Sequence, residues 1–166
     1  EAVRSFLKGK WSFAKTVNYR VGGGRGTMTG TATFTETAQR PDVLMYEERG
    51  YLQLDGVPKP LECYRKYCFN TGVYPVEVYF VDDPTKKELP TLLPELQEHT
   101  AFFVPLPFGE LTEAEGMKAK FDHLCVNDMY SGTLSVPSST SFTWNWSVAG
   151  PSKDGTIECT YERVDA

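Results

Sequence analysis

Residues 142–148 read Phe-Thr-Trp-Asn-Trp-Ser-Val, and this stretch decides the fold. Every second residue in it is bulky and apolar, whereas the residues between them are small and polar. Alternation with a period of two residues is the pattern of a β-strand that buries one face. Gly150 and Pro151 follow shortly after and end the pattern. The stretch therefore predicts a strand that points two tryptophans into the interior of a small domain.

Stretches with the same period lie on both sides of this strand. Residues 27–35 carry threonine at every odd position, which predicts a strand with a β-branched outer face. Gly50 indicates a bulge or bend within the stretch 43–54. The opening stretch belongs to an expected strand over residues 141–149, and the other expected strands cover residues 6–19, 61–69, 76–81, 117–126, 129–136 and 156–164. About eight to ten short antiparallel strands with tight turns are typical of an all-β barrel or sandwich.

The alternation fails between residues 82 and 116. Prolines stand at positions 84, 90, 94, 105 and 107 of this segment. Residues 91–99 fit a short helix, and residues 101–108 are apolar but interrupted by proline. Connections of this length are usually functional. Two interpretations stay open: a loop packed over one end of the barrel, or a lid or interface.

Length and composition bound the class of protein. The 166 residues predict one domain, and 40% hydrophobic residues are enough to form a core. The net charge is −5, and no block of Lys and Arg is interleaved with aromatic residues. This argues against a nucleic-acid or anionic-membrane partner. No apolar run approaches the roughly 20 residues of a membrane-spanning helix.

Cysteine usage bears on the compartment. The chain has four cysteines, Cys63, Cys68, Cys125 and Cys159, fewer than a secreted disulfide scaffold contains. We interpret them as mostly free thiols in a reducing, intracellular compartment. The cytoplasm is expected, or an organelle if a targeting segment upstream of Glu1 has been removed.

Several short motifs stand in a fixed order along the chain. They are Gly9-Lys10-Trp11, Gly30-x-Ala32-x-Phe34, Tyr46-x-Glu48-x-Gly50, Arg65-x-Tyr67-x-Phe69, His123-x-Cys125-x-x-Asp128-x-Tyr130-x-Gly132 and Trp146-x-Val148-x-Gly150-Pro151-x-Lys153. With them the chain resembles the domain-of-unknown-function family 6314, a small barrel domain found in bacteria and eukaryotes. The resemblance covers most of the chain and implies a single closed, calycin-like barrel, as in lipocalins and fatty-acid-binding proteins. It implies no established activity.

The chain departs from that family's pattern after the stretch 76–81. Relatives carry a short Asp-Gly-Arg turn there, whereas this chain has Asp82-Asp83-Pro84 and then the long segment 82–116. The departure leaves open whether the mouth of the barrel is plugged or covered by a lid.

Glu48 and Arg65 form the first candidate constellation. If Leu54 pairs with Lys59 around the turn, Glu48 lies opposite Arg65, whereas a tighter turn places Glu48 opposite Cys63. Both registers keep the two charges on one interior face. An unpaired buried charge is very costly, so an internal ion pair that fixes the register is one interpretation. The other is an anion site in which Arg65 holds a ligand carboxylate.

The segment with His123, Cys125, Asp128 and Tyr130 is the second constellation. A zinc site is not expected, because only His99 supplies a second imidazole and no CxxC pair exists. A Cys-His nucleophile is not expected either, since neighbouring strand residues rarely reach the required geometry. His123 is interpreted as a core or lumen residue, or else as a ligand contact or general acid/base.

Large aromatic residues form the third candidate constellation. A barrel of about eight strands is just wide enough to fill itself or to hold one small ligand. The rings therefore either fill the interior or line an apolar pocket. They are Trp11, Phe34, Tyr67, Phe69, Trp144, Trp146 and Tyr161.

Three hypotheses about the function remain open. The first is a non-enzymatic barrel that binds an apolar ligand, with or without an acidic group, and uses no metal or other cofactor. The second is a structural or interaction subunit whose partner binds segment 82–116 through exposed Leu92, Leu93, Phe102, Phe103, Leu106 and Phe108. The third is an enzyme with His123 as acid/base. The candidate ligand-binding residues are Tyr46, Glu48, Arg65, Tyr67, His123, Asp128, Tyr130, Trp146 and Arg163.

Overall fold

The computed structural model describes residues 2–21, 23–38, 40–81, 100–108, 117–125 and 127–164. One short helix, α1 (Ala2–Leu7), precedes the strands. The strands are β1 (Gly9–Val21), β2 (Arg25–Glu36), β3 (Val43–Leu54), β4 (Leu61–Asn70), β5 (Val76–Val81), β6 (Thr100–Leu106), β7 (Met117–Cys125), β8 (Asp128–Ser138), β9 (Ser141–Ala149) and β10 (Asp154–Arg163).

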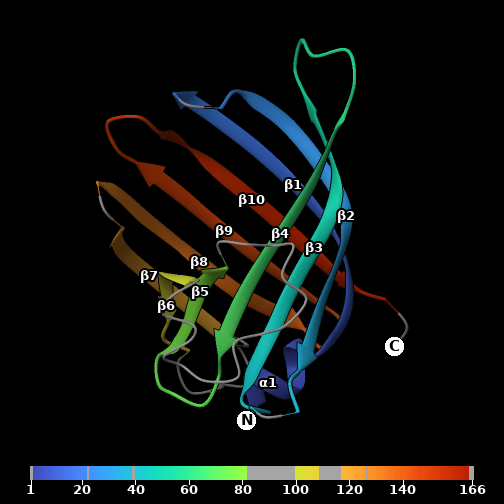
Figure 1. The fold of residues 1–166 in the computed structure, drawn as a ribbon, viewed down its shortest axis with the longest axis vertical. Helices are drawn as coiled ribbons and strands as arrows, with labels where there is room; N and C mark the ends of the chain where they lie inside the picture. Colours follow the sequence, from blue (N-terminus) through green and yellow to red (C-terminus); the bar gives the residue numbers. More distant parts are fainter. Residues whose placement is uncertain are drawn as a thin grey trace.

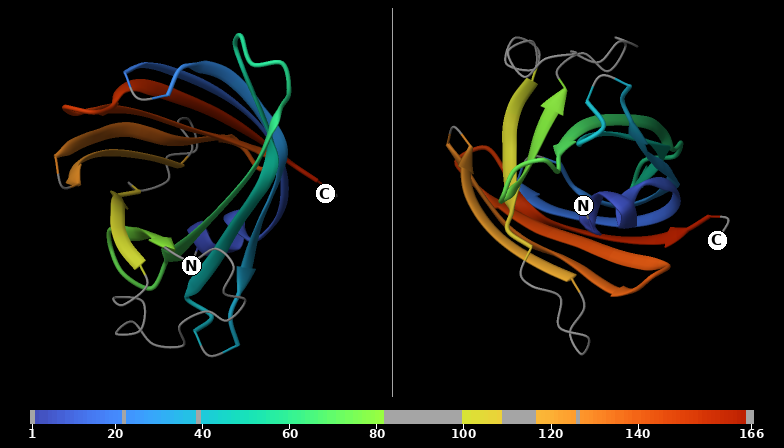
Figure 2. Two further views of the ribbon diagram at one scale, coloured as in Figure 1. Left: turned by 45° about the horizontal axis from the view of Figure 1, so that its top comes forward. Right: turned by 90° about the horizontal axis from the view of Figure 1, so that it is seen from below.

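These strands form one antiparallel, 10-stranded sheet in the order β6-β5-β4-β3-β2-β1-β10-β9-β8-β7. Strands β1 and β10 pair with each other, from Trp11 opposite Arg163 to Tyr19 opposite Gly155. The sheet therefore curls into an up-and-down barrel (Figures 1 and 2). Its edge strands β6 and β7 contact each other, but their described residues form no hydrogen-bonded ladder. The all-β antiparallel barrel predicted from the sequence is confirmed.

The period-two pattern places one face of each strand inside the barrel. In β9, the bulky residues of the stretch 142–148 are at most 7% exposed, as predicted. In β2, Met28, Ala32 and Phe34 are buried, and most of the threonines between them face solvent. The sequence left open whether the aromatic rings fill the interior or line a pocket. In the half of the barrel next to α1 they fill the interior, and in the other half they line a cavity.

Helix α1 covers one end of the barrel, and the sequence analysis did not predict it. Leu7 is 1% exposed, and the Phe6 ring lies 5.4 Å from the Trp11 ring. The indole Nε1 of Trp11 donates a hydrogen bond of 2.8 Å to the backbone oxygen of Leu7. Six residues are too short to show a helical period. In the described part of the chain, no helix is long and apolar enough to cross a membrane.

Arg163 secures this helix from the other end of the chain. Its guanidinium donates hydrogen bonds to the backbone oxygens of Phe6 and Lys8 and lies 4.2 Å from the centre of the Trp11 ring. Arg163 therefore joins the end of β10 to α1.

The sequence indicated a bulge or a bend at Gly50, and the structure has no bulge or register shift there. It lies directly opposite Gly30 in an unbroken β2–β3 ladder. A Cβ atom at Gly50 would lie 2.2 Å from the backbone oxygen of Thr29, and one at Gly30 would lie 1.9 Å from that of Arg49. Glycine is thus required because the backbones of β2 and β3 approach closely here.

The segment 82–116 is not a continuous loop. Residues 100–106 form strand β6, which pairs with β5. Phe103, Leu106 and Phe108 were expected to be exposed, but they are at most 9% exposed, because they pack into the core of the barrel. The expected short helix over 91–99, with Leu92 and Leu93, and the Phe102 side chain lie outside the described residues.

The close approach at Gly50 gives a test of the fold. We expect Gly50→Ala to lower the free energy of unfolding by about 1–3 kcal/mol, because the added methyl group meets backbone that cannot move freely. The control, Thr31→Val, lies on the exposed face of β2 and should change stability by less than about 0.5 kcal/mol. Urea denaturation followed by tryptophan fluorescence measures both. Equal stability of Gly50→Ala and the unsubstituted protein would contradict the described packing.

Candidate functional site

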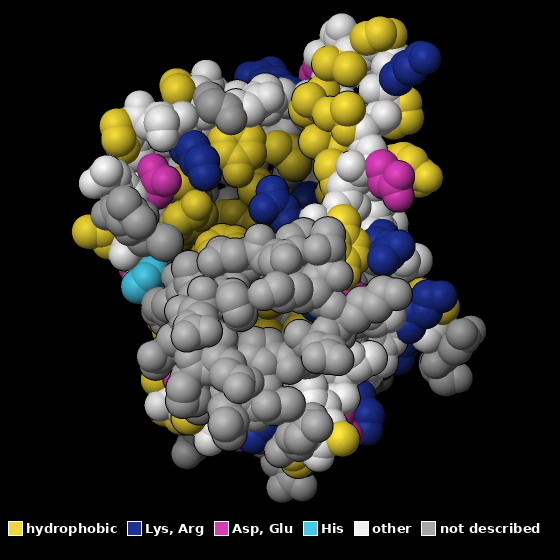
Figure 3. Space-filling view, in the orientation of Figure 1, with side chains coloured by type: hydrophobic (Ala, Val, Ile, Leu, Met, Phe, Trp, Pro, Cys, Tyr) yellow, Lys and Arg dark blue, Asp and Glu magenta, His cyan; other side chains and the backbone are white. Residues whose placement is uncertain are grey.

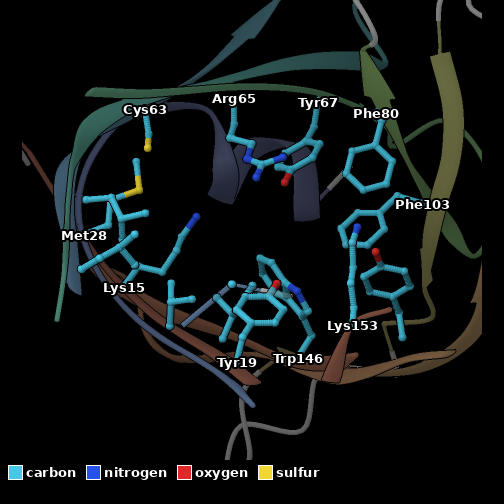
Figure 4. A pocket seen from close by; sticks show the side chains of 16 residues that line it. Lys15, Tyr19, Met28, Cys63, Arg65, Tyr67, Phe80, Phe103, Trp146 and Lys153 are labelled. Carbon is cyan, nitrogen blue, oxygen red and sulfur yellow. The ribbon is translucent and has the colours of Figure 1, made fainter. Parts of the chain in front are cut away.

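A cavity of about 420 Å³ opens into the half of the barrel opposite α1. Helix α1 precedes the start of β1, whereas Tyr19 and Gly23, at and beyond the other end of that strand, line the cavity. In Figure 3 the molecule is hollowed at this end, and hydrophobic side chains together with Lys and Arg side chains surround the hollow. Figure 4 shows the lining from close by.

The wall of the cavity is largely aromatic. Rings come from β1, β4, β5, β6, β8 and β9, and they are Tyr19, Tyr67, Phe80, Phe103, Tyr130 and Trp146. Several contact one another; Phe80 and Phe103, for example, have ring centres 4.3 Å apart. Smaller apolar side chains, among them Met28, line the opposite side in Figure 4. A concave aromatic wall with a few polar groups is typical of small-molecule sites.

The polar side of the cavity is cationic. Lys15, Arg65 and Lys153 line it, and no Asp or Glu is among its described lining residues. The chain as a whole carries a net charge of −5, so this local excess of positive charge runs against the overall balance.

Lys15 and Glu48 form an ion pair at the inner end of the cavity. The Lys15 Nζ lies 2.9 Å and 3.0 Å from the two carboxylate oxygens of Glu48. The Lys15 side chain is 8% exposed and that of Glu48 is 0% exposed, so both charges are buried. A buried ion pair is expensive to form and more expensive to break, because breaking it leaves one charge uncompensated.

Of the two registers left open by the sequence, the structure has the one that places Glu48 opposite Arg65, but the expected ion pair between these two residues is not formed. The two residues are directly opposite in the β3–β4 ladder, which is the first of the two registers considered. Both carboxylate oxygens of Glu48 contact Lys15 instead. Among the described residues, no carboxylate lies within 4.0 Å of Arg65. Arg65 is thus left with its guanidinium in the cavity (Figure 4).

The surroundings of Arg65 keep it charged and keep its tyrosine neighbours neutral. The pKa of Arg65 is raised, mainly by Tyr67 and to a smaller extent by Glu48. Burial raises the pKa of Tyr67 and of Tyr19, and the nearby Arg65 only partly offsets this. Both phenols therefore keep their protons at neutral pH and can donate hydrogen bonds into the cavity.

Lys153 is placed by the turn between β9 and β10. The backbone nitrogen of Gly150 donates a hydrogen bond of 2.8 Å to the backbone oxygen of Lys153. A Cβ atom at Gly150 would lie 1.9 Å from Oδ1 of Asp128, so the Asp128 side chain at the start of β8 packs directly against this turn. Asp128 does not line the cavity; it packs against the turn that carries Lys153.

Four of the residues selected from the sequence line the cavity, namely Arg65, Tyr67, Tyr130 and Trp146. The structure places the others elsewhere. Tyr46 lies in the filled half, where its hydroxyl is 2.8 Å from that of Tyr161, and Arg163 lies at the α1 end. His123 is paired with Tyr130 in the β7–β8 ladder but is not among the described lining residues.

The sequence analysis missed two of the three cations in the described lining of the cavity. Lys15 continues the buried face of β1 two residues after Phe13, so the period-two pattern carried the signal. Lys153 belongs to the last motif of the ordered set, which ends Gly150-Pro151-x-Lys153. It lies in a turn, where periodicity does not tell which way a side chain points.

The described thiols are not paired. Cys63, Cys68 and Cys159 are free, and the Cys125 side chain lies outside the described part. Burial raises the pKa of Cys68 to about 12 and that of Cys159 to about 11, whereas Cys63 lines the cavity. Within the described residues, no three His, Cys, Asp or Glu side chains are arranged to hold a metal ion.

Comparison with known proteins gives one family and a few similar folds. The model of a "Family of unknown function (DUF6314)" matches residues 7–163. No curated protein sequence matches the chain. The solved S-type phycobiliprotein lyase CPES from Guillardia theta is 7% identical, with a TM-score of 0.55 over 99% of this chain and 92% of that chain. At this identity the likeness concerns the fold alone.

Two redesigned β-barrels match less well in three dimensions. The barrel b11L5F_LGL has a TM-score of 0.40 at 15% identity, covering 98% of this chain and 95% of its own. The barrel mFAP0, bound to DFHBI, has a TM-score of 0.41 at 17% identity, covering 95% of this chain and 99% of its own.

The buried ion pair has a testable consequence for stability. We expect Lys15→Met to lower the free energy of unfolding by about 3–5 kcal/mol, because it leaves the Glu48 carboxylate buried without a cation. The double variant Lys15→Met/Glu48→Leu should recover most of this loss, since it removes both charges. Urea denaturation measures these changes, and Arg20→Met, which breaks an exposed pair with Asp154, is the control and should change little. A double variant no more stable than Lys15→Met would contradict the pairing.

Proposed function

The chain belongs to the family of unknown function DUF6314, and we propose that it binds one small apolar molecule with an anionic group in the cavity of the barrel. The observation that carries the proposal is the combination of an aromatic wall with Arg65 and Lys153, for which the described lining supplies no acidic partner. The likeness to the solved phycobiliprotein lyase supports the architecture only.

The size of the cavity suits a small molecule. Ligand pockets in proteins usually measure about 300–1,000 Å³, and this one is about 420 Å³. Apolar parts of the ligand would lie against Trp146, Phe80 and Phe103, where burial of apolar surface favours binding by roughly 25 cal/mol per Å².

The charged side chains of the cavity favour a ligand whose polar group is an anion. Lys15 is already neutralised by Glu48, so Arg65 and Lys153 are the cations that a ligand would meet. A guanidinium presents planar N–H donors that match a carboxylate, and the neutral phenols of Tyr19 and Tyr67 supply further donors. An anion therefore gains charge-assisted hydrogen bonds that a neutral analogue of the same shape does not.

Binding is favoured over the two other functions. His123, the proposed acid/base of the enzyme hypothesis, lies outside the described lining of the cavity. Of the six apolar residues behind the interaction hypothesis, Phe103, Leu106 and Phe108 are buried inside the barrel. The side chains of the other three, Leu92, Leu93 and Phe102, lie outside the described residues. Neither a metal nor another cofactor is part of the proposal.

The proposal is tested with two matched probes, 2-naphthoate and the neutral 2-naphthylmethanol. Titration calorimetry should show tighter binding of the naphthoate. In Arg65→Met, naphthoate affinity should fall about 10- to 100-fold, as expected for loss of hydrogen bonds worth about 1.5–3 kcal/mol to a charged group. The affinity for the alcohol should change little.

The control is Arg49→Met, because Arg49 lies on the exposed face of β3 and stacks on Tyr64, 4.7 Å from its ring centre. It should bind both probes like the unsubstituted protein. Equal affinity for the acid and the alcohol, or an equal loss in both arginine variants, would sink the proposal. As a second readout, bound naphthoate should slow iodoacetamide alkylation of Cys63, mapped by peptide mass spectrometry, because that thiol lines the cavity.

A further inference from the structure

Lys15 combines features that a binding cavity alone does not require. Its Nζ points into the cavity (Figure 4), although its side chain is only 8% exposed. Both oxygens of Glu48 lie within 3.0 Å of that nitrogen. An apolar side chain at position 15 would complete the wall without the cost of burying a charge.

We propose that Lys15 forms a covalent imine with an aldehyde or ketone that enters the cavity. The inference rests on the proposed function to the extent that the cavity must admit a small apolar molecule. Lysine amines in desolvated pockets are nucleophiles toward carbonyl compounds, provided that a nearby group takes their proton. Glu48 is that group, because its oxygens are already in hydrogen-bond contact with the ammonium.

The reaction needs no other reactant. Glu48 takes one proton from the Lys15 ammonium, and the free amine nitrogen attacks the carbonyl carbon. One of the two protons left on that nitrogen moves to the carbonyl oxygen, which gives a neutral carbinolamine. The carbon–oxygen bond then breaks, and the oxygen leaves as water with the proton returned by Glu48. In sum, a carbonyl compound and one ammonium give one protonated imine and one water, and the charge is conserved.

The site favours the cationic product. The positive charge stays at the lysine nitrogen, so the Glu48 carboxylate remains its counter-ion. The aromatic rings of Phe13 and Trp146 lie 5.5 Å and 5.9 Å from this nitrogen, within the range of cation–π attraction. Burial also limits the access of water, which would hydrolyse the imine.

Lys153 provides an internal comparison. It also lines the cavity, but it is exposed, and none of the described carboxylates lies within 4.0 Å of its ammonium. With no described group placed to take its proton, Lys153 should react slowly. The geometry thus assigns the reaction to Lys15 rather than to Lys153, the two lysines of the described lining.

The test uses 2-naphthaldehyde, which has the same rings as the naphthoate probe, with sodium cyanoborohydride to reduce any imine. We expect one naphthylmethyl group per chain, mapped to Lys15 by peptide mass spectrometry. Lys15→Arg keeps a cation beside Glu48 and should lose this label completely. Glu48→Gln should slow labelling about 100-fold, the usual lower range for a general acid/base. Lys10→Arg, on the exposed face of β1, should label like the unsubstituted protein.

Naphthoate binding separates the two proposals. If Lys15→Arg binds naphthoate and the unsubstituted protein is labelled only at Lys153 or at surface lysines, the imine is refuted and the binding function stands. Unchanged labelling in Glu48→Gln would refute the role of the carboxylate. If neither naphthoate nor naphthaldehyde enters the cavity, both proposals fail. Retained naphthoate binding also shows that Lys15→Arg is folded.

Discussion

The buried ion pair between Lys15 and Glu48 divides the barrel into two halves. On one side of it, aromatic rings and α1 fill the interior; on the other, the cavity opens to solvent. The pair links β1 to β3 across β2, which lies between them in the sheet. Gly30 occupies the interior position of β2 between Met28 and Ala32, so no side chain stands in the way of Lys15. Gly30 and Gly50, where β2 and β3 approach closely, and the ion pair thus belong to one arrangement.

The same pair sets the electrostatics of the cavity. Without Lys15, the Glu48 carboxylate would be the nearest partner for Arg65, which lies opposite it in the ladder. Because Lys15 takes both carboxylate oxygens, Arg65 stays available to a ligand. Arg65 therefore remains available in the cavity because its closest anion, Glu48, is paired with Lys15.

The sequence predicted the strands and their faces well, because the period of two is a local property. It narrowed the residue opposite Glu48 to Arg65 or Cys63, since the length of a hairpin turn sets the register, and the structure shows Arg65. The contact between Lys15 and Glu48 joins residues two strands apart in the sheet, and no pattern within a single strand shows it. Strand β6 was missed because proline interrupts it, at Pro105. An edge strand tolerates proline, since it pairs on one side only.

Native mass spectrometry of the protein purified from its own source tests the central claim most directly. Under gentle ionisation, the account predicts the mass of the chain plus one small molecule. Under denaturing ionisation that molecule should separate and be identified as an apolar compound with an acidic group or, if covalently held, remain as an adduct of the chain. A chain that carries no small molecule and instead co-purifies with other proteins would contradict the account and would make the barrel a scaffold.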